Sequence, residues 1–379
     1  MIYLDYAAAT PVDERVLAAM QPYWSELFYN PSSSTLAAKK VRTALEDARA
    51  RVAHWLGAKP AEVVFTAGAT ESVSMAINGV LRRYPDAQVL ATATEHDAVL
   101  ATAAQYNHAL IPVHANGTID LEALKKLISE TTVLVSVGYA NNEIGTIQNL
   151  KAVAAVLQEA RSLRRLKNNP LPLFLHTDAS QAIYLDLHVS RLGVDMLTLN
   201  GGKMYGPKQT GILWVKSGVD LQPFIIGGGQ ERGLRGGTEN VPGVIGLATA
   251  LDIVQSERHQ AIATLSALRD TLQRNLQEAF PDMVVNGNQK KRLPNNLHVS
   301  WSGLDGERLL MLLEERGVMA STGAACAANK HSKSQVLTAI GCSNAALQGS
   351  LRLTLGRLTT PGDIVEASRA IIGAVRSLA

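Results

Sequence analysis

Lys203 is the side chain in this sequence best suited to covalent chemistry on a carbonyl compound. It follows a short apolar run and is flanked by glycines in Asn200-Gly-Gly-Lys-Met-Tyr-Gly-Pro207. A lysine amine at the end of a buried strand can form a Schiff base, although most lysines are simply solvated. Asp178 ends another apolar run, where it could bind a ligand or cap the next helix. Both side chains would lie at the same edge of a parallel sheet.

A second pattern predicts a binding site for an anion. Thr66-Ala-Gly-Ala-Thr-Glu71 lies between an apolar run and a helical pattern, so its glycine lets the backbone turn and the new helix presents free N–H groups. Thr70 adds a hydroxyl. An ordinary strand–helix turn has the same composition, so the motif is informative only in combination. An amine, an acid and an anion site together indicate a phosphorylated aldehyde cofactor.

Cys326 is a candidate nucleophile. It lies among small residues in Ser321-Thr-Gly-Ala-Ala-Cys326, as a thiol that must move requires, although cysteine is more often a buried space-filler. For Cys342 the space-filling interpretation is the better one. His96 stands at a strand-to-helix turn, and because the sequence has no HxxxH or HxH pattern, no metal site is expected.

The elements that must position these residues alternate along the chain. Short apolar runs separated by helical patterns of ten to fifteen residues indicate βαβ units on a mostly parallel, buried sheet. Strands are predicted at 63–65, 88–93, 110–113, 133–137, 173–176, 196–199 and 212–215, and helices at 37–56, 71–81, 98–106, 121–128 and 150–163. Gly57 is expected to cap the helix over 37–56, and Thr10 with Pro11 to begin an earlier one.

The pattern changes from about Val241, where one long helical stretch runs to about Phe280. Further strands around 297–300 and 351–354, with helices around 308–315 and 364–375, predict a smaller α+β domain. We expect a large domain over 1–250, whose N-terminal segment packs with the small domain, and a small domain over 251–379. The segment 161–172 is interpreted as a basic surface loop.

Composition excludes several classes of protein. The 379 residues are 46% hydrophobic, which excludes a disordered chain, and two cysteines are too few for a disulfide framework. A net charge of +3 argues against nucleic acid as the main partner. The N-terminus resembles no signal peptide and no apolar run approaches the ~18 residues of a membrane span, so a cytoplasmic protein without membrane attachment is expected.

Taken together, the motifs resemble those of the cysteine desulfurases, pyridoxal-phosphate enzymes of the aminotransferase class V group. The resemblance runs nearly end to end. It rests on Leu4-Asp-Tyr-Ala-Ala-Ala-Thr-Pro11, Gly68-Ala-Thr-Glu-Ser72, Thr94-Glu-His96, Asn141-Asn-Glu-Ile-Gly145, Asp178-Ala-Ser-Gln181, Lys203-Met-Tyr-Gly-Pro-Lys208, the glycine-rich 227–238, 321–326 and Leu351-Arg-Leu-Thr-Leu-Gly-Arg357.

The resemblance implies fold type I, with a seven-stranded, mostly parallel sheet, a small C-terminal domain and a homodimer with shared active sites. It also implies a role for each matching position. Lys203 would be the Schiff-base lysine and Cys326 the nucleophile. The cofactor ring would be stacked by His96, held at its pyridinium by Asp178 and on its hydroxyl side by Gln181. The phosphate would be bound by Ala69, Thr70, Asn200 and, from the other subunit, Thr238, and the substrate carboxylate by Arg352 and Asn142.

Two positions depart from the family pattern. Gly202 stands where the family usually has histidine, and Asn200 where it usually has serine or threonine, and both positions normally help to hold the phosphate. We expect the carboxamide of Asn200 and the N–H groups of Gly201 and Gly202 to compensate. The chain also ends at Ala379 without the extension that many members use to dock an iron–sulfur scaffold.

The predicted function is that of an L-cysteine desulfurase, which converts L-cysteine to L-alanine and holds the sulfur as a persulfide on Cys326. The sulfur would pass to an acceptor protein, either an iron–sulfur scaffold or a thiolation enzyme. One alternative is another class V reaction, transamination or selenocysteine lyase chemistry. The other is a cofactor-free scaffold or sulfur-relay homologue, which only Asn200 and Gly202 support.

Overall fold

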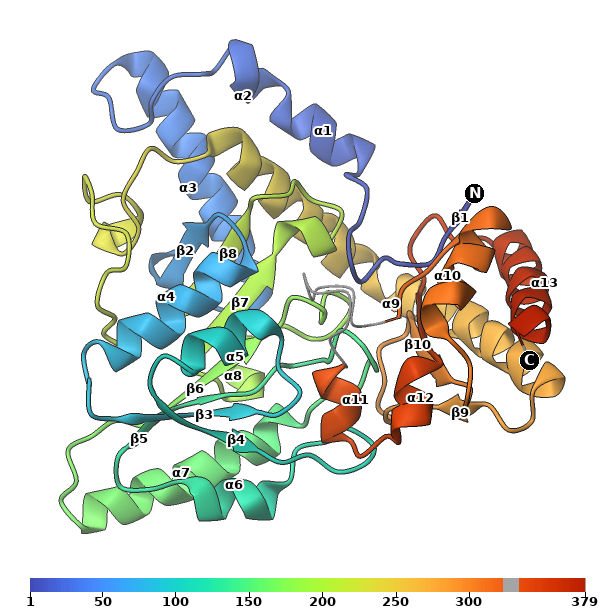
Figure 1. Ribbon diagram of the computed structural model, residues 1–379. Helices are drawn as coiled ribbons and strands as arrows, with labels where there is room; N and C mark the ends of the chain where they lie inside the picture. Colours follow the sequence, from blue (N-terminus) through green and yellow to red (C-terminus); the bar gives the residue numbers. More distant parts are fainter. Residues whose placement is uncertain (323–333, 379) are drawn as a thin grey trace.

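The computed structural model describes residues 1–322 and 334–378, and its centre is a seven-stranded sheet (Figure 1). The strand order is β2-β8-β7-β6-β5-β3-β4, and only the pairs that involve β8 are antiparallel. The predicted mostly parallel sheet is therefore confirmed. The strands are β2 (Val63–Thr66), β3 (Gln88–Thr92), β4 (Asn107–Ile111), β5 (Thr132–Ser136), β6 (Phe174–Asp178), β7 (Met196–Asn200) and β8 (Gly211–Val215).

Both faces of the sheet are buried, which explains why its strands are continuous apolar runs. Val63 and Phe65 of β2 point into one apolar cluster, whereas Val64 between them belongs to another. This alternation follows from the two-residue period of a strand. The helices around the sheet are α3 (Leu36–Leu56), α4 (Ala69–Leu81), α5 (Asp97–Ala103), α6 (Leu121–Leu127), α7 (Leu150–Leu166) and α8 (Val189–Leu192).

The N-terminal helices confirm one predicted boundary and correct another. Gly57 caps α3 in the left-handed conformation (φ 60°), as expected. The first helix, α1 (Glu14–Met20), begins later than predicted, because Asp13 rather than Thr10 caps it; α2 (Pro22–Ser25) follows. The Thr10 hydroxyl instead donates to the carbonyl of Gly202 and accepts from the N–H of Tyr205. Thr10 therefore fixes the loop around Lys203.

The C-terminal part forms a second layer of structure beside the large sheet (Figure 1). Helix α9 (Val241–Ala279) runs from the large sheet to a three-stranded antiparallel sheet of order β12-β10-β9, and β1 pairs in parallel with β11. The expected boundary at residue 250 falls inside α9, and we keep the two-domain division as a proposal. The elements are β1 (Ile2–Tyr3), β9 (Val284–Val285), β10 (Asn296–Ser300), α10 (Gly306–Glu315), β11 (Val318–Met319), α11 (Gln335–Ala339), α12 (Asn344–Gln348), β12 (Ser350–Thr354) and α13 (Pro361–Leu378).

The segment 161–172 differs from the predicted surface loop. Its first half continues α7 to Leu166, and the Arg164 side chain is buried. The Arg164 guanidinium donates to the carbonyls of Leu171, Pro172, Ser129 and Thr132. Local composition indicated solvent exposure, but the bonds to the end of its own segment and to the start of β5 make Arg164 a structural residue. Among the described residues, no helix is long and apolar enough to cross a membrane.

Candidate active site

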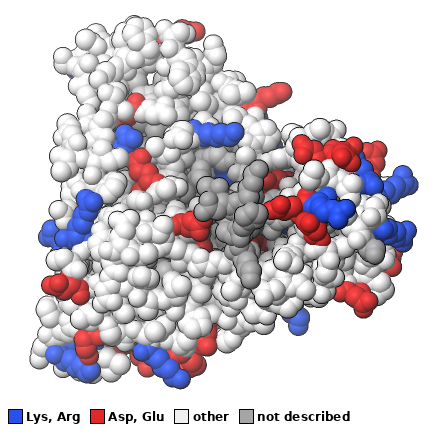
Figure 2. Space-filling model, in the orientation of Figure 1, with Lys and Arg blue, Asp and Glu red and all other residues white. Residues whose placement is uncertain are grey.

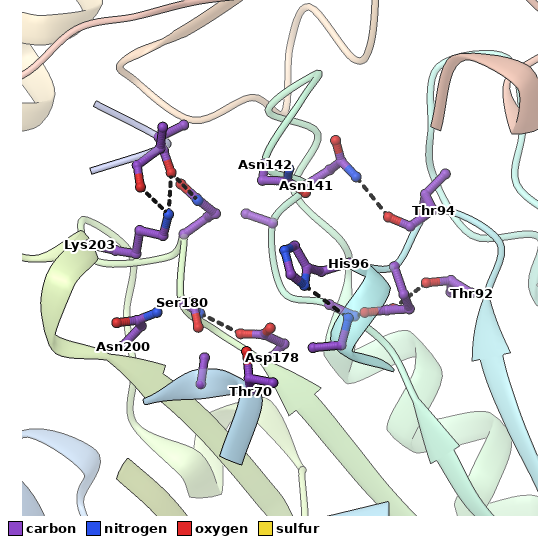
Figure 3. A pocket seen from close by; sticks show the side chains of 18 of the residues that line it. Thr70, Thr92, Thr94, His96, Asn141, Asn142, Asp178, Ser180, Asn200 and Lys203 are labelled. Carbon is purple, nitrogen blue, oxygen red and sulfur yellow. Dashed lines mark hydrogen bonds between the residues drawn. The ribbon is translucent and has the colours of Figure 1, made fainter. Parts of the chain in front are cut away.

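A pocket of about 260 Å³ opens at the carboxyl ends of the parallel strands (Figure 3). Ligands of open α/β sheets bind at this edge because the loops that follow the strands converge there. The pocket brings together residues that lie up to 345 positions apart in the sequence, from Ala7 to Arg352. Of the predicted site residues, it is lined by Ala69, Thr70, His96, Asn142, Asp178, Gln181, Asn200, Lys203 and Arg352.

Lys203 is held in the pocket rather than solvated. It ends the short 3₁₀ helix η2 (Gly201–Lys203) that directly follows β7. Its Nζ donates to the carbonyl oxygens of Ala7 (2.8 Å) and Ala8 (2.5 Å), and Nε2 of Gln181 also donates to the Ala7 carbonyl (3.1 Å). These two carbonyls fix the position of the amine. The N-terminal segment therefore positions the candidate nucleophilic amine.

Asp178 ends β6 and points into the pocket. Its Oδ1 accepts the N–H of Ser180 at 2.9 Å. Two residues earlier on the same strand, His176 is fully buried, and burial lowers its pKa to about 4. Both its ring nitrogens face hydroxyls, of Ser136 and Thr198, so a neutral imidazole lies beneath the carboxylate. Asp178 therefore presents its carboxyl group to the pocket from the end of this strand.

His96 and its neighbour Glu95 form the turn between β3 and α5. Nδ1 of His96 accepts the N–H of Ala98 at 3.0 Å, so in the neutral ring Nε2 carries the proton. Glu95 lines the pocket although only 7% of it is exposed. It accepts from the Thr92 hydroxyl and from the N–H of Gly138 at 2.6 Å, and burial raises its pKa to about 7. Sequence reasoning missed Glu95 as a pocket residue, although it lies within the quoted motif.

Arg352 brings a positive charge from β12 to the opposite wall of the pocket. Only 3% of its side chain is exposed. Its Nη1 donates to the backbone carbonyl of Asn142 (3.2 Å), and its Nη2 to Oδ1 of Asp5 (2.6 Å). A guanidinium so placed can bind a carboxylate through two parallel hydrogen bonds. Asp5 was quoted only as part of a motif, and its contact with Arg352 was not foreseen.

The expected compensation by the glycine amides is wrong. The N–H of Gly202 donates to Oδ1 of Asn200 (3.0 Å), and the N–H of Gly201 donates to the carbonyl of Thr210 (2.9 Å). Both amides are therefore engaged within the protein. The Nδ2 group of Asn200 is the donor that this loop offers to the pocket, since Oδ1 is occupied as a cap. Thr70 lies in the first turn of α4, at its positive end.

Two predicted residues are not placed in this pocket. Thr238 is exposed and lines a separate hollow with Gly237 and Asn240. Cys326 lies outside the described residues. The other thiol, Cys342, is half-buried, donates to Oδ1 of Asn286 (3.6 Å) and has its pKa raised by burial, which makes it a poor nucleophile at neutral pH.

Comparison with known proteins shows the family of this chain. The profile of the family described as Aminotransferase class-V matches residues 2–366. The cysteine desulfurase IscS 1 of Archaeoglobus fulgidus is 39% identical, and the alignment covers 100% of this chain and 98% of that relative. The chain belongs to the class-V aminotransferase family. The resemblance seen in the sequence motifs is confirmed.

Solved structures also resemble this class-V protein over nearly its whole length. A structure described as a NifS-like protein superposes with a TM-score of 0.91 at 33% identity, covering 100% of both chains. Another, described as SspA in complex with cysteine, has a TM-score of 0.79 at 33% identity and covers 94% of this chain and 99% of that one. The predicted fold is confirmed by these neighbours.

Proposed function

We propose that this class-V protein is a pyridoxal-phosphate-dependent L-cysteine desulfurase. The relatives named as cysteine desulfurases, and the similar structure solved with cysteine, confirm the activity predicted from the sequence. The observation that carries the assignment to particular residues is the convergence of Lys203, Asp178 and Arg352 on one pocket. They supply an amine, an anion and a carboxylate anchor around a space for one small ligand.

The residues present fit pyridoxal phosphate. Asp178 offers an anion for the pyridinium nitrogen, and Thr70 with Asn200 offers donors for the phosphate. The Ser180 hydroxyl lines the same pocket, is buried and has no hydrogen-bond partner among the described residues. A buried hydroxyl without a partner is costly, so a ligand that accepts or donates there would remove a penalty.

When bound, the cofactor supplies an electron-withdrawing ring that stabilises negative charge at Cα of the amino acid. Lys203 holds the cofactor and, once released, takes the Cα proton on Nζ, and the carbonyls of Ala7 and Ala8 then hold the resulting ammonium. Asp178 keeps the proton on the ring nitrogen. Arg352 and Asn142 hold the substrate carboxylate.

The sulfur step belongs to Cys326. Its thiolate attacks the sulfur of the bound cysteine, and the carbon–sulfur bond breaks with its electron pair left on Cβ. Protonation of Cβ and return of the Cα proton from Lys203 then yield alanine. Cys326 then carries the sulfur as a persulfide. His96, with its N–H on Nε2, would offer a hydrogen bond to the reacting groups within the pocket.

A homodimer would complete the site. Thr238 lies outside the described pocket, so it would reach the phosphate only from a second copy. Large apolar side chains are exposed near the N-terminus, at Leu17, Trp24, Phe28 and Leu36, and the surface over α1 and α2 carries few charges (Figure 2). Such a surface favours contact with another protein.

The sulfur acceptor would be a protein, either an iron–sulfur scaffold or a thiolation enzyme. Several relatives are named IscS, and a similar structure is that of DndA from Streptomyces lividans. A persulfide is consumed by a thiol, so the acceptor would present a cysteine. A free thiol nucleophile also favours a reducing compartment such as the cytoplasm.

The test of this function uses purified protein with its bound cofactor. L-cysteine should yield alanine and sulfide in the presence of a reducing thiol, and borohydride should attach the cofactor mass to the peptide that contains Lys203. Lys203→Ala should abolish both results. Cofactor attached to Lys208 instead, or alanine formed without Lys203, would overturn the assignment.

A further inference from the structure

The hydrogen bonds that the Arg352 guanidinium makes within the protein leave some of its N–H groups for a ligand. Its Nε is buried without a partner among the described residues. One N–H of Nη1 donates to the Asn142 carbonyl, and one N–H of Nη2 donates to the Asp5 carboxylate. Because a guanidinium has five N–H groups, one remains on each terminal nitrogen. These remaining N–H groups are available to a ligand carboxylate.

Asp5 is held beside Arg352 by the backbone. The N–H of Leu4 donates to the carbonyl of Met319, and the carbonyl of Leu4 accepts the N–H of Thr354. Asp5 also forms a β-bridge with Thr354, which lies two residues from Arg352 on β12. Three residues further along, the carbonyl of Ala8 binds Nζ of Lys203. One short segment therefore contacts both cations of the site.

We propose that Asp5 is a positioning residue that orients Arg352 and limits the strength with which it binds the carboxylate shared by L-cysteine and L-alanine. The proposal rests on the proposed function, in which Arg352 is the carboxylate anchor. Asp5 forms an ion pair with the Arg352 nitrogen that also serves the ligand. The ligand carboxylate therefore meets a second negative charge across one guanidinium, and like charges at this range oppose binding.

This arrangement has a distinctive kinetic consequence. Substrate and product carry the same carboxylate, so Asp5 weakens the binding of both equally. An interaction that is the same in the ground state and the transition state changes KM and leaves kcat unchanged.

The test compares Asp5→Asn with Asp5→Ala in the holoenzyme. Asparagine keeps a hydrogen-bond acceptor and removes the charge, so KM for L-cysteine and the inhibition constant of L-alanine should both fall, by the same factor of about three to ten. Alanine at position 5 also removes the orienting contact, so Asp5→Ala should bind both ligands less tightly than Asp5→Asn. Cysteamine lacks the carboxylate, and its binding, followed by the cofactor absorbance, should be unchanged in either variant.

Asp13→Asn is the matched control, since Asp13 forms a similar ion pair with Arg357 (2.8 Å) and does not line the pocket. It should leave the constants for cysteine and alanine unchanged. The role of Asp5 would be overturned if Asp5→Asn changed the binding of cysteamine as much as that of alanine. It would also be overturned if this variant bound alanine less tightly than the parent protein. If Arg352→Ala left alanine binding unchanged, the carboxylate anchor itself, and hence the proposed function of Arg352, would be wrong.

Discussion

The Ser334 hydroxyl donates a hydrogen bond of 2.6 Å to the carboxyl of Glu143, and so joins the start of α11 to the loop that carries Asn142. Glu143 is 8% exposed, and burial raises its pKa to about 7 despite the nearby positive charge of Arg352. Ser334 also caps α11 by accepting the N–H of Leu337. A protonatable carboxyl therefore joins the large sheet to the C-terminal part beside the active site.

The stability of the protein should fall as pH rises from about 4.5 to about 7, in part because of Glu143. In this range the folded carboxyl keeps its proton while the unfolded one has lost it, so the folded state binds more protons. A shift of this size corresponds to at most about 3 kcal/mol. Glu143→Gln should remove that part of the pH dependence. Urea unfolding at pH 5 and pH 8 measures it.

Glu95→Gln is the companion experiment, because Glu95 has the same raised pKa but a different set of partners. Each substitution should reduce the loss of stability between the two pH values, and the double variant should reduce it further. An unchanged pH dependence in Glu143→Gln would mean that its carboxyl is ionised in the folded protein at pH 5.

Substitution by serine should distinguish the roles of Cys326 and Cys342. Cys326→Ser should still bind L-cysteine and shift the cofactor absorbance, because that step needs only Lys203, but alanine and sulfide should not form. Cys342→Ser should retain activity, since the Cys342 thiol is half-buried and its pKa is raised. Mass spectrometry should find the persulfide on Cys326. A persulfide on Cys342 would reverse the assignment.

The sequence was sufficient for the alternating strands and helices and for most of the pocket, because strand ends and glycine-rich turns are local signals. It was insufficient where a side chain has a distant partner. Thr10 carries the pattern of a helix cap, yet its hydroxyl binds the loop around Lys203. Asp5 contacts Arg352, 347 positions away, and no local periodicity predicts that ion pair. The buried acid Glu95 likewise depends on the N–H of Gly138.

Asn200 should decide how well the protein retains its cofactor. Its Oδ1 caps the N–H of Gly202, so Nδ2 is the group available to a phosphate. Asn200→Asp keeps the shape and the cap but replaces the donor by an anion, so it should release pyridoxal phosphate much faster on dialysis. Asn200→Ser restores a hydroxyl and should retain the cofactor. Absorbance of the dialysed protein measures both.

Gly202→His is the complementary change, because a Cβ at Gly202 would lie 3.5 Å from its nearest neighbours, Oδ1 of Asn200 and Cγ of Lys208. This is ordinary contact, so a Cβ can be added at this position without displacing the loop. We expect cofactor retention to be equal or better. If Asn200→Asp retained the cofactor as tightly as the parent protein, the phosphate would have to be held without Asn200.

Arg164 should contribute more to the free energy of unfolding than its exposed neighbour Arg165. Its guanidinium binds four backbone carbonyls, so Arg164→Ala would leave these acceptors, the buried carbonyl of Thr132 among them, without this donor. Such a loss costs roughly 3 kcal/mol. Arg165 is exposed, and among the described residues its guanidinium bonds the Ser162 hydroxyl in the same helix, so Arg165→Ala should cost about 0.5 kcal/mol or less. Urea unfolding of both variants measures the difference. Equal values would mean that the carbonyls near Arg164 are satisfied by water once the side chain is removed.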